Sequence, residues 1–207
     1  MGRKNSVETR QRVILEALKL FAAKGFDSVS LAEIATASEI TPMGLYKHFP
    51  SKQSIIDAIM EISDKGFHER MEEMKVDFDE HPEPYVNMSE SEQMERLKQL
   101  FLHTLDDELP ALMRKLMTVE QFHIPEFADV YNERYCFSQF REHESLFGLW
   151  MKKGRMKKTD AHLLSVEYIS PVIVMINICD RTPDYKENAL MLIEAHVKEF
   201  NKHYMVK

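Results

Sequence analysis

The sequence predicts an all-helical protein of about nine helices, with a small N-terminal domain and a larger C-terminal one. Three observations support this prediction. Apolar residues recur every three or four positions along most of the chain, whereas the alternating pattern of strands is scarce. Helix-start signals, in which serine or threonine precedes glutamate by three positions or precedes proline directly, occur before several of these segments. The 207 residues, 44% of them hydrophobic, can supply a core for one large domain or two small ones.

A pair of short helices joined by a tight turn is predicted between residues 30 and 49. Ser30 and Glu33 form the pairing of a capping box, which places the start of the first of these helices at residue 31. Thr41 can cap the second helix, and Pro42 suits its first position because the amide hydrogen is not needed there. This arrangement is typical of a helix-turn-helix, whose second helix enters the major groove of DNA.

The other helices follow the same periodicity. Ser51 is the expected cap of a long helix that ends near the prolines of residues 81–84. Ser89 and Glu92 form a second capping box. Pro171 is expected to bend the helix that contains it. With the pair above, the predicted helices cover residues 9–25, 52–80, 90–105, 111–122, 125–154, 159–179 and 183–204.

The first quarter of the chain resembles the tetracycline-repressor-like (TetR) family of transcriptional regulators. The segment TRQRVILEALKLFAAKGF (residues 9–26), Ser30 with residues 34–35, and GLYKHF (residues 44–49) with residues 51–52 each stand where that family has them. The resemblance implies that the first helix packs across the other two and that the third enters the major groove. It also implies a DNA-binding domain over residues 1–53 and a ligand-binding and dimerisation domain over residues 54–207, in a cytoplasmic protein.

Charge is distributed unevenly between these two predicted domains. The whole chain has a net charge of -7, which by itself disfavours a nucleic-acid partner. Residues 1–53, however, carry +3, so the remaining residues carry -10. A basic N-terminal part on an acidic body favours contact with double-stranded DNA at one end only.

Candidate DNA contacts lie on the third helix and at the start of the next. Lys52 falls in a positively polarised first turn, where a cation is unfavourable unless an anion such as phosphate attracts it. The resemblance implies backbone contacts for Lys52, Tyr46 and His48, with simple packing as the alternative for the last two. Pro42 and Met43 offer apolar surface that suits a thymine methyl group. The full candidate set is Ser30, Thr41, Pro42, Met43, Gly44, Tyr46, Lys47, His48 and Lys52.

Methionine and aromatic residues are abundant in the middle helices, and methionine adapts to irregular apolar ligands. The residues predicted to bind an unknown small-molecule effector are Phe101, His103, Leu105, Met113, Met117, Phe122, Tyr131, Phe147, Trp150 and Met151. The alternative is that these stripes form the core. A closed second domain would favour a helix-turn-helix regulator without a small-molecule inducer, either constitutive or controlled by a protein.

The last two helices carry apolar stripes that suggest a surface left unburied within one subunit. Packed against a two-fold copy, they would form a four-helix interface and place two recognition helices about 34 Å apart, as a palindromic site requires. The predicted homodimer residues are Leu164, Tyr168, Val172, Met175, Leu190, Ile193, Val197 and Phe200. Completion of a monomeric core is the alternative.

Other function classes find little support in the sequence. It contains no nucleophile elbow, phosphate-binding glycine loop or HExxH motif, so an enzyme is not expected. His103, His123 and His143 are 20 residues apart on different predicted helices, which is not metal-ligand spacing, and no metal or cofactor is expected. Cys136 and Cys179 are expected to be reduced, with a redox pair as the alternative. No signal peptide or membrane span is expected. The predicted function is a homodimeric repressor released from a palindromic operator by a small apolar or amphipathic ligand, where repression is what the resemblance implies.

Overall fold

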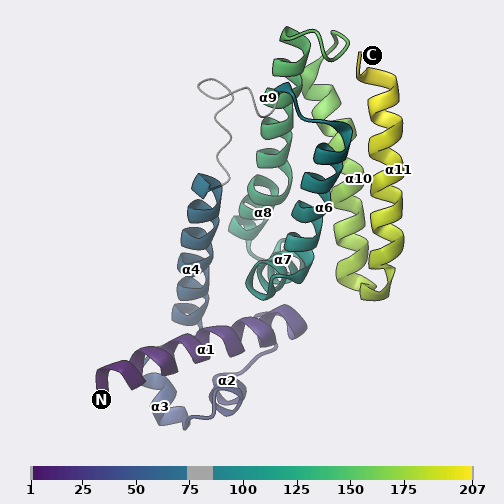
Figure 1. Cartoon of the computed structure of the whole chain (residues 1–207). Coiled ribbons are helices and arrows are strands. Elements are labelled where there is room, and N and C mark those ends of the chain that lie inside the picture. The colour runs from purple at the N-terminus through teal and green to yellow at the C-terminus, as the bar shows by residue number, and fades with distance from the viewer. Residues whose placement is uncertain (1, 74–85, 207) are drawn as a thin grey trace. The chain divides into compact units, whose positions relative to one another are not determined.

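The computed structural model describes residues 2–73 and 86–206, which are helical almost throughout (Figure 1). Extended pairing within these residues is limited to an isolated bridge between Met156 and Met205. The all-helical fold class is therefore confirmed. The described residues form two compact units, one from residues 2–73 with 108–128 and the other from 86–107 with 129–206. The functional division at residue 53 concerns a different property and stays a prediction.

The first unit consists of the three N-terminal helices, the helix that follows them and one helix from later in the chain. They are α1 (Gly2–Lys24), α2 (Leu31–Ala37), α3 (Pro42–Tyr46), α4 (Lys52–Glu73) and α7 (Glu108–Glu120). Side chains from α1 to α4 that are almost completely buried make its core, namely Val13, Leu18, Phe21, Ile34, Leu45, Phe49, Ile55 and Ile59. Burial of this much apolar surface fixes α2 and α3 against α1, because neither short helix would be stable alone.

The caps predicted at Ser30, Thr41 and Ser89 are present in the structure. The Ser30 hydroxyl accepts the Glu33 amide at 3.2 Å, while the Ser30 amide donates to the Glu33 carboxylate at 2.8 Å. The Thr41 hydroxyl accepts the Gly44 amide at 3.1 Å. Ser89 and Glu92 form the second capping box. These bonds satisfy amides that the first turn of a helix leaves without partners, which explains why the helices begin where the sequence predicted.

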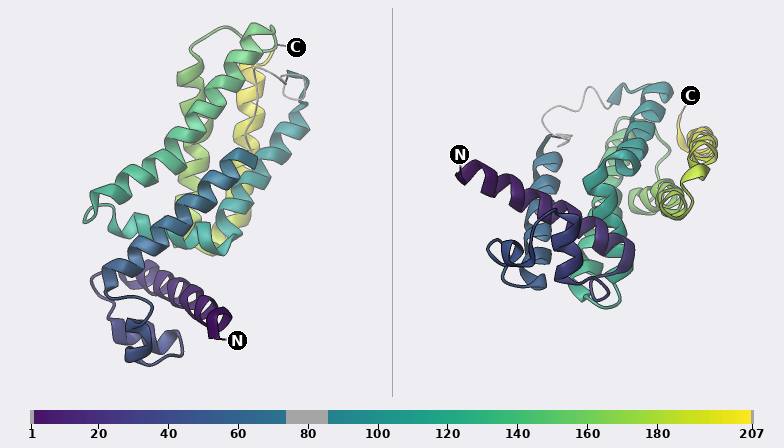
Figure 2. Two further views of the ribbon diagram at one scale, coloured as in Figure 1. Left: turned by 90° about the vertical axis from the view of Figure 1, so that its left-hand side faces the viewer. Right: turned by 90° about the horizontal axis from the view of Figure 1, so that it is seen from below.

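The second unit is a bundle of longer helices. α6 (Glu90–Asp106), α9 (Ser138–Lys152), α10 (Ala161–Arg181) and α11 (Lys186–Tyr204) belong to it, and α8 (Pro125–Asn132) leads into it. A π-helical turn, η1 (Glu133–Phe137), joins α8 to α9, and a short 3-10 turn, η2 (Pro183–Tyr185), precedes α11. Figure 2 shows α10 and α11 lying side by side.

Several helices differ in detail from the sequence prediction. α1 begins at Gly2 rather than at residue 9. The single helix predicted over residues 125–154 is interrupted by η1, a form that accommodates an extra residue within a helix. α7 begins at Glu108 rather than at residue 111. Pro110 is tolerated because it occupies the first turn, where the carboxylate of Glu108 is also favoured. The predicted extension of α4 beyond Glu73 lies outside the described residues.

An aromatic cluster forms the centre of the second unit. The ring centroids of Phe147, Tyr168 and Phe200 lie 4.8 to 5.4 Å apart, and Trp150 lies 5.7 Å from Phe147. Trp150 is 2% exposed, and the Arg155 guanidinium lies 6.0 Å from its ring centroid. Aromatic rings at these separations add favourable ring-to-ring interactions to a large buried area.

α10 is the most apolar of the described helices. By length and composition alone it could cross a membrane, a criterion that the core helix of a soluble protein also meets. One side of α10 is buried in the bundle through Leu164, Ile169 and Val172. Its apolar composition is therefore partly explained by packing within the unit.

Candidate nucleic-acid interface

The orientation of α3 follows from its cap and from the residues it buries. Leu45 and Phe49 are at most 1% exposed and hold the helix against the core of the first unit. A side-chain carbon at Gly44 would lie 3.3 Å from the Thr41 hydroxyl, so the absence of a side chain there lets the capping bond form without crowding. Tyr46 and Lys47, which lie between these anchors, consequently face solvent.

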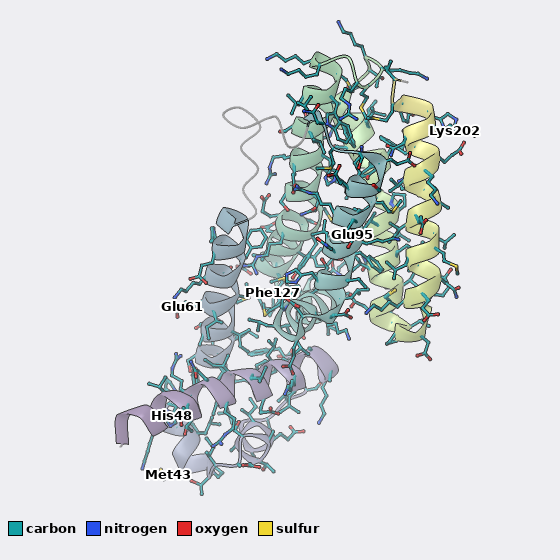
Figure 3. All side chains as sticks on the ribbon, viewed as in Figure 1. Met43, His48, Glu61, Glu95, Phe127 and Lys202 are labelled. Atoms are coloured by element: carbon teal, nitrogen blue, oxygen red, sulfur yellow. The ribbon has the colours of Figure 1, made fainter. Side chains whose placement is uncertain are left out.

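The outward face of α3 carries apolar and basic side chains. Met43 is 73% exposed and Tyr46 is 54% exposed, and Lys47 is also exposed. Figure 3 shows Met43 pointing away from the neighbouring helices. His48 is half-buried. The structure thus places Thr41, Pro42, Met43, Tyr46 and Lys47 together on one accessible surface, while their contacts with DNA stay a prediction.

Arg10 lies next to this surface. Its guanidinium is 4.7 Å from the ring centroid of Phe49, the residue that follows α3 by three positions, and the Arg10 side chain is exposed. A cation over an aromatic face is attracted by the ring quadrupole. The contact joins α1 to the end of α3, a tertiary approach that the spacing of residues in the sequence could not predict.

Lys52 has a different set of partners from the one that the sequence suggested. Its ammonium donates to the carbonyls of Phe26 at 2.6 Å and Val29 at 3.0 Å, and lies 3.3 Å from that of Asp27. It also lies 4.4 Å from the ring centroid of Phe26. These carbonyls are electronegative partners of the Lys52 ammonium, a role that the sequence analysis predicted for a DNA phosphate. An ammonium has three donors, so a phosphate contact by Lys52 would have to replace some of these bonds.

Ser30 is likewise engaged within the fold. Its hydroxyl and amide both serve the capping box with Glu33, whose carboxylate also accepts from Lys24 at 3.0 Å. The bond from the Ser30 amide, followed by the bond from Lys24, lowers the pKa of Glu33 from 4.5 to about 2. Any contact of Ser30 with DNA would have to share groups that already stabilise the start of α2.

The predicted effector-binding residues are divided between the two units. Phe101, Phe147, Trp150 and Met151 are buried in the core of the second unit, with Leu105 packed at its edge. Tyr131 is half-buried, and its hydroxyl lies 3.3 Å from the Asn177 side-chain oxygen. His103 pairs with Asp107 at 2.8 Å. Met113 and Met117 belong to the first unit.

The prediction for Phe122 needs correction. Its side chain is 87% exposed in the turn after α7, so among the described residues it is a surface residue rather than part of an interior. Phe122 follows the end of α7. The helical periodicity that suggested an inward-facing side chain therefore does not extend to this residue.

The predicted dimer residues also need correction, because α10 and α11 bury a different face from the one expected. Six of the eight, Leu164, Tyr168, Val172, Ile193, Val197 and Phe200, are at most 5% exposed within a single chain. Met175 and Leu190 pack at the edge of the same core. The apolar residues that these helices leave at the surface are instead Leu163, Val174, Met191 and Leu192.

Glu120 is a functional candidate that the sequence analysis missed. It ends α7, its side chain is 7% exposed, and its carboxylate accepts the Phe26 amide at 2.6 Å. The two residues are 94 positions apart. The sequence shows only an acidic residue at the end of an amphipathic helix, and the burial of that residue becomes apparent only in the fold.

The match to known proteins is concentrated in the part of the chain that contains α3 and its exposed face. Residues 13–59 match the family model described as bacterial regulatory proteins, tetR family. This segment contains α2, α3 and the start of α4, and it is the part of the chain that the tetR family model describes. The HTH-type transcriptional regulator AcrR of Shigella flexneri is 31% identical over 120 residues, which make up 58% of this chain and 51% of AcrR. The match thus spans about half the length of that TetR-family relative. AcrR is named as a regulator and not as an enzyme, in agreement with the prediction.

Solved structures of transcriptional regulators have a similar fold along most of the chain. A putative transcriptional regulator from Saccharomonospora viridis, in complex with choline, has a TM-score of 0.65 and 19% identity, covering 97% of this chain and 100% of its own. The complex of Stenotrophomonas maltophilia SmeT with triclosan has a TM-score of 0.64 and 15% identity, covering 97% and 93%. At these identities the likeness establishes the fold alone, which includes an N-terminal helix-turn-helix followed by a larger helical part.

Proposed function

We propose that this protein is a TetR-family regulator of transcription that binds double-stranded DNA through α3. The observation that carries the proposal is the accessible face of the capped α3, on which Met43, Tyr46 and Lys47 are exposed together. A helix held by its buried side while its outward face presents a cation and apolar groups suits the major groove, where phosphates flank thymine methyl groups. The proposed contact set is Thr41, Pro42, Met43, Gly44, Tyr46, Lys47 and His48, with Ser30 and Lys52 ordering the elements behind it.

Selection of bound sequences from a random DNA pool tests this proposal with the full chain. We expect enrichment of a palindrome whose half-sites are centred about 34 Å apart, one turn of DNA. Tyr46→Ala combined with Lys47→Ala should abolish enrichment, whereas Glu61→Ala, an exposed change on α4, should retain it. Sequence-independent binding by the unmodified chain, or none, would contradict the proposal.

We further propose that the protein acts as a homodimer that pairs α10 and α11 with those of a second copy. Leu163 and Val174 are 64% and 51% exposed and lie eleven positions apart, which places them on one side of α10. Met191 and Leu192 extend exposed apolar surface onto α11. Helix pairs of this kind associate with a two-fold copy into a four-helix interface, which would explain exposed aliphatic residues on a cytoplasmic protein.

Control by a small apolar or amphipathic ligand is the proposed mode of regulation, with release from the operator as its effect. SmeT, which shares this fold, is described as the repressor of a multidrug efflux pump, and its complex contains triclosan. Triclosan and choline are therefore suitable first probes. If either acts as an inducer, operator affinity should fall by about 5- to 150-fold, the usual range for coupled sites.

A regulator without a small-molecule inducer is the second candidate function. The observation that favours it is the packing of Phe101, Phe147 and Trp150, none more than 2% exposed, in the core where the pocket was predicted. Operator binding that stays unchanged across a broad panel of apolar and amphipathic compounds would support this second candidate over ligand control.

A further inference from the structure

The loop between α1 and α2 is held from two sides by groups of opposite charge. On one side, the Glu120 carboxylate accepts the backbone amide of Phe26 at 2.6 Å. On the other, the Lys52 ammonium donates to the backbone carbonyl of the same residue at 2.6 Å and to that of Val29 at 3.0 Å. The backbone of Phe26 therefore connects α7, which ends at Glu120, to α4, which begins at Lys52 directly after the helix-turn-helix.

Gly25 makes this arrangement possible. Its φ angle is +81°, which side-chain-bearing residues rarely adopt, and it ends α1 by turning the chain towards the loop. A side-chain carbon at this position would lie 3.0 Å from the carboxylate oxygen of Glu120. The close approach of α7 to the loop thus depends on the absence of a side chain at residue 25.

Because Glu120 is buried, its carboxylate needs the hydrogen bond from the loop. Transfer of a carboxylate out of water is unfavourable unless hydrogen bonds compensate, and the Phe26 amide is such a donor. The nearest imidazole nitrogen, in His123, lies 3.8 Å from the other carboxylate oxygen. Displacement of α7 away from the loop would leave the carboxylate without its amide partner, so α7 and the loop are expected to move together.

α7, which carries the Glu120 contact, is connected to the second unit at both of its ends along the chain. α6 of the second unit ends at Asp106, two residues before α7 begins, and the chain re-enters the second unit at Asp129. α7 is also tied to α1 at its start, where Lys19 and Glu108 lie 3.3 Å apart. α7 is therefore one of the connections along the chain between the second unit and the helix-turn-helix, and it is hydrogen-bonded to the first loop of that motif.

We infer that Glu120 is a positioning residue for DNA binding, which holds the helix-turn-helix in a fixed orientation to α7 through the backbone of Phe26. The inference rests on the proposed function as a dimeric DNA-binding regulator. It assigns to Glu120 the task of restricting which half-site spacing the dimer accepts, since a loosely held helix-turn-helix could adapt to several spacings.

Full-length protein and three DNA duplexes test the inference. One duplex carries the selected palindrome, and the other two have one base pair inserted or removed at its centre. In the unmodified protein the altered spacings should bind much more weakly than the selected one. With Glu120→Ala the ratio of these affinities should shrink about tenfold, within the range usual for coupled sites. Glu120→Gln, which keeps an acceptor oxygen, should restore most of the discrimination, and Glu126→Ala, an exposed carboxylate of α8, should leave it unchanged.

Amide hydrogen exchange provides the second measurement. Protection of the Phe26 amide should be lost in Glu120→Ala and kept in Glu126→Ala, while the amides of α9 to α11 keep their protection in both. Loss of protection throughout the chain in Glu120→Ala would show a purely structural role and overturn the inference. Unchanged spacing discrimination in a folded Glu120→Ala protein would overturn it as well. Failure of the unmodified chain to select any DNA would instead refute the proposed function, so the two failures are distinguishable.

Discussion

The outward side of α3 and the outward sides of α10 and α11 both expose large apolar side chains, yet they differ in what surrounds them. On α3, Met43 and Tyr46 stand beside exposed Lys47. On α11, exposed Met191 lies on a helix whose lysines form ion pairs with carboxylates, as Lys198 does with Glu194 at 2.7 Å. Apolar groups combined with an available cation suit a polyanion, whereas aliphatic groups among neutralised charges suit another aliphatic surface. One chain thereby carries two surfaces with different proposed partners.

The largest expected effect comes from placing a charge on the aliphatic surface. Met191→Glu combined with Leu163→Glu should convert the dimer to a monomer in sedimentation velocity, because the carboxylates would be buried without partners. Operator affinity should fall by about 100-fold or more, since two linked half-site contacts become independent. Phe137→Glu, which alters an exposed residue of η1, is the matched control. Persistence of the dimer would show that the aliphatic surface serves another purpose.

Lys47 and Lys52 offer the next test, because one faces solvent and the other holds a loop. Lys47→Ala should reduce the slope of log affinity against log salt by about 2 for a dimer, one phosphate per subunit. Lys52→Met should leave the slope unchanged but destabilise the first unit by roughly 1 to 3 kcal/mol, as its carbonyl partners lose a charged donor. Chemical denaturation, monitored by hydrogen exchange of the α2 amides, would measure the loss of stability in Lys52→Met. A reduced slope in Lys52→Met would restore the phosphate contact first expected for it.

A smaller effect is expected for the apolar tip of α3. Met43→Ala should weaken discrimination at a single base pair by about 1 kcal/mol, or roughly fivefold, if the side chain contacts a thymine methyl group. Binding to operators that carry uracil in place of thymine measures the same contact from the DNA side. An equal loss of affinity at every base pair of the operator, or no loss at all, would show that Met43 does not take part in base recognition.

The smallest effect concerns acid stability at the start of α2. Because the capping box and Lys24 lower the pKa of Glu33 from 4.5 to about 2, the ionised form favours the folded state. This contribution is complete above pH 4.5 and is lost as the pH falls towards 2. Glu33→Gln should therefore destabilise the first unit at neutral pH, and the difference from the unmodified protein should vanish near pH 2. If the difference in stability between Glu33→Gln and the unmodified protein did not depend on pH, the negative charge of Glu33 would not be what stabilises the cap.

The sequence was sufficient for features that depend on neighbouring residues. Ser30 with Glu33, Thr41 with Pro42, and Ser89 with Glu92 identified helix starts because each cap is completed within four positions. The face of α3 that remains exposed also followed from its periodicity, because Leu45 and Phe49 are its only large aliphatic or aromatic anchors.

Features that depend on distant segments could not be read in this way. α10 and α11 are apolar around much of their circumference, so their patterns did not reveal that Leu164 and Val197 face inward while Leu163 and Leu192 face outward. The partners of Lys52 lie 23 to 26 positions away, and that of Glu120 lies 94 positions away. A charged side chain that binds backbone carbonyls or amides leaves no complementary residue in the sequence to indicate the pairing.

The burial of Trp150 in the second unit has a practical consequence. It is the only tryptophan of the chain, and it is enclosed by Phe147 and the guanidinium of Arg155. Its fluorescence should be blue-shifted in the native protein and should move to longer wavelength only when the second unit opens. The first unit contains no tryptophan and is silent at those wavelengths, whereas circular dichroism records the helices of both. Melting curves from the two signals would coincide if the units unfold together and separate if the DNA-binding end unfolds alone.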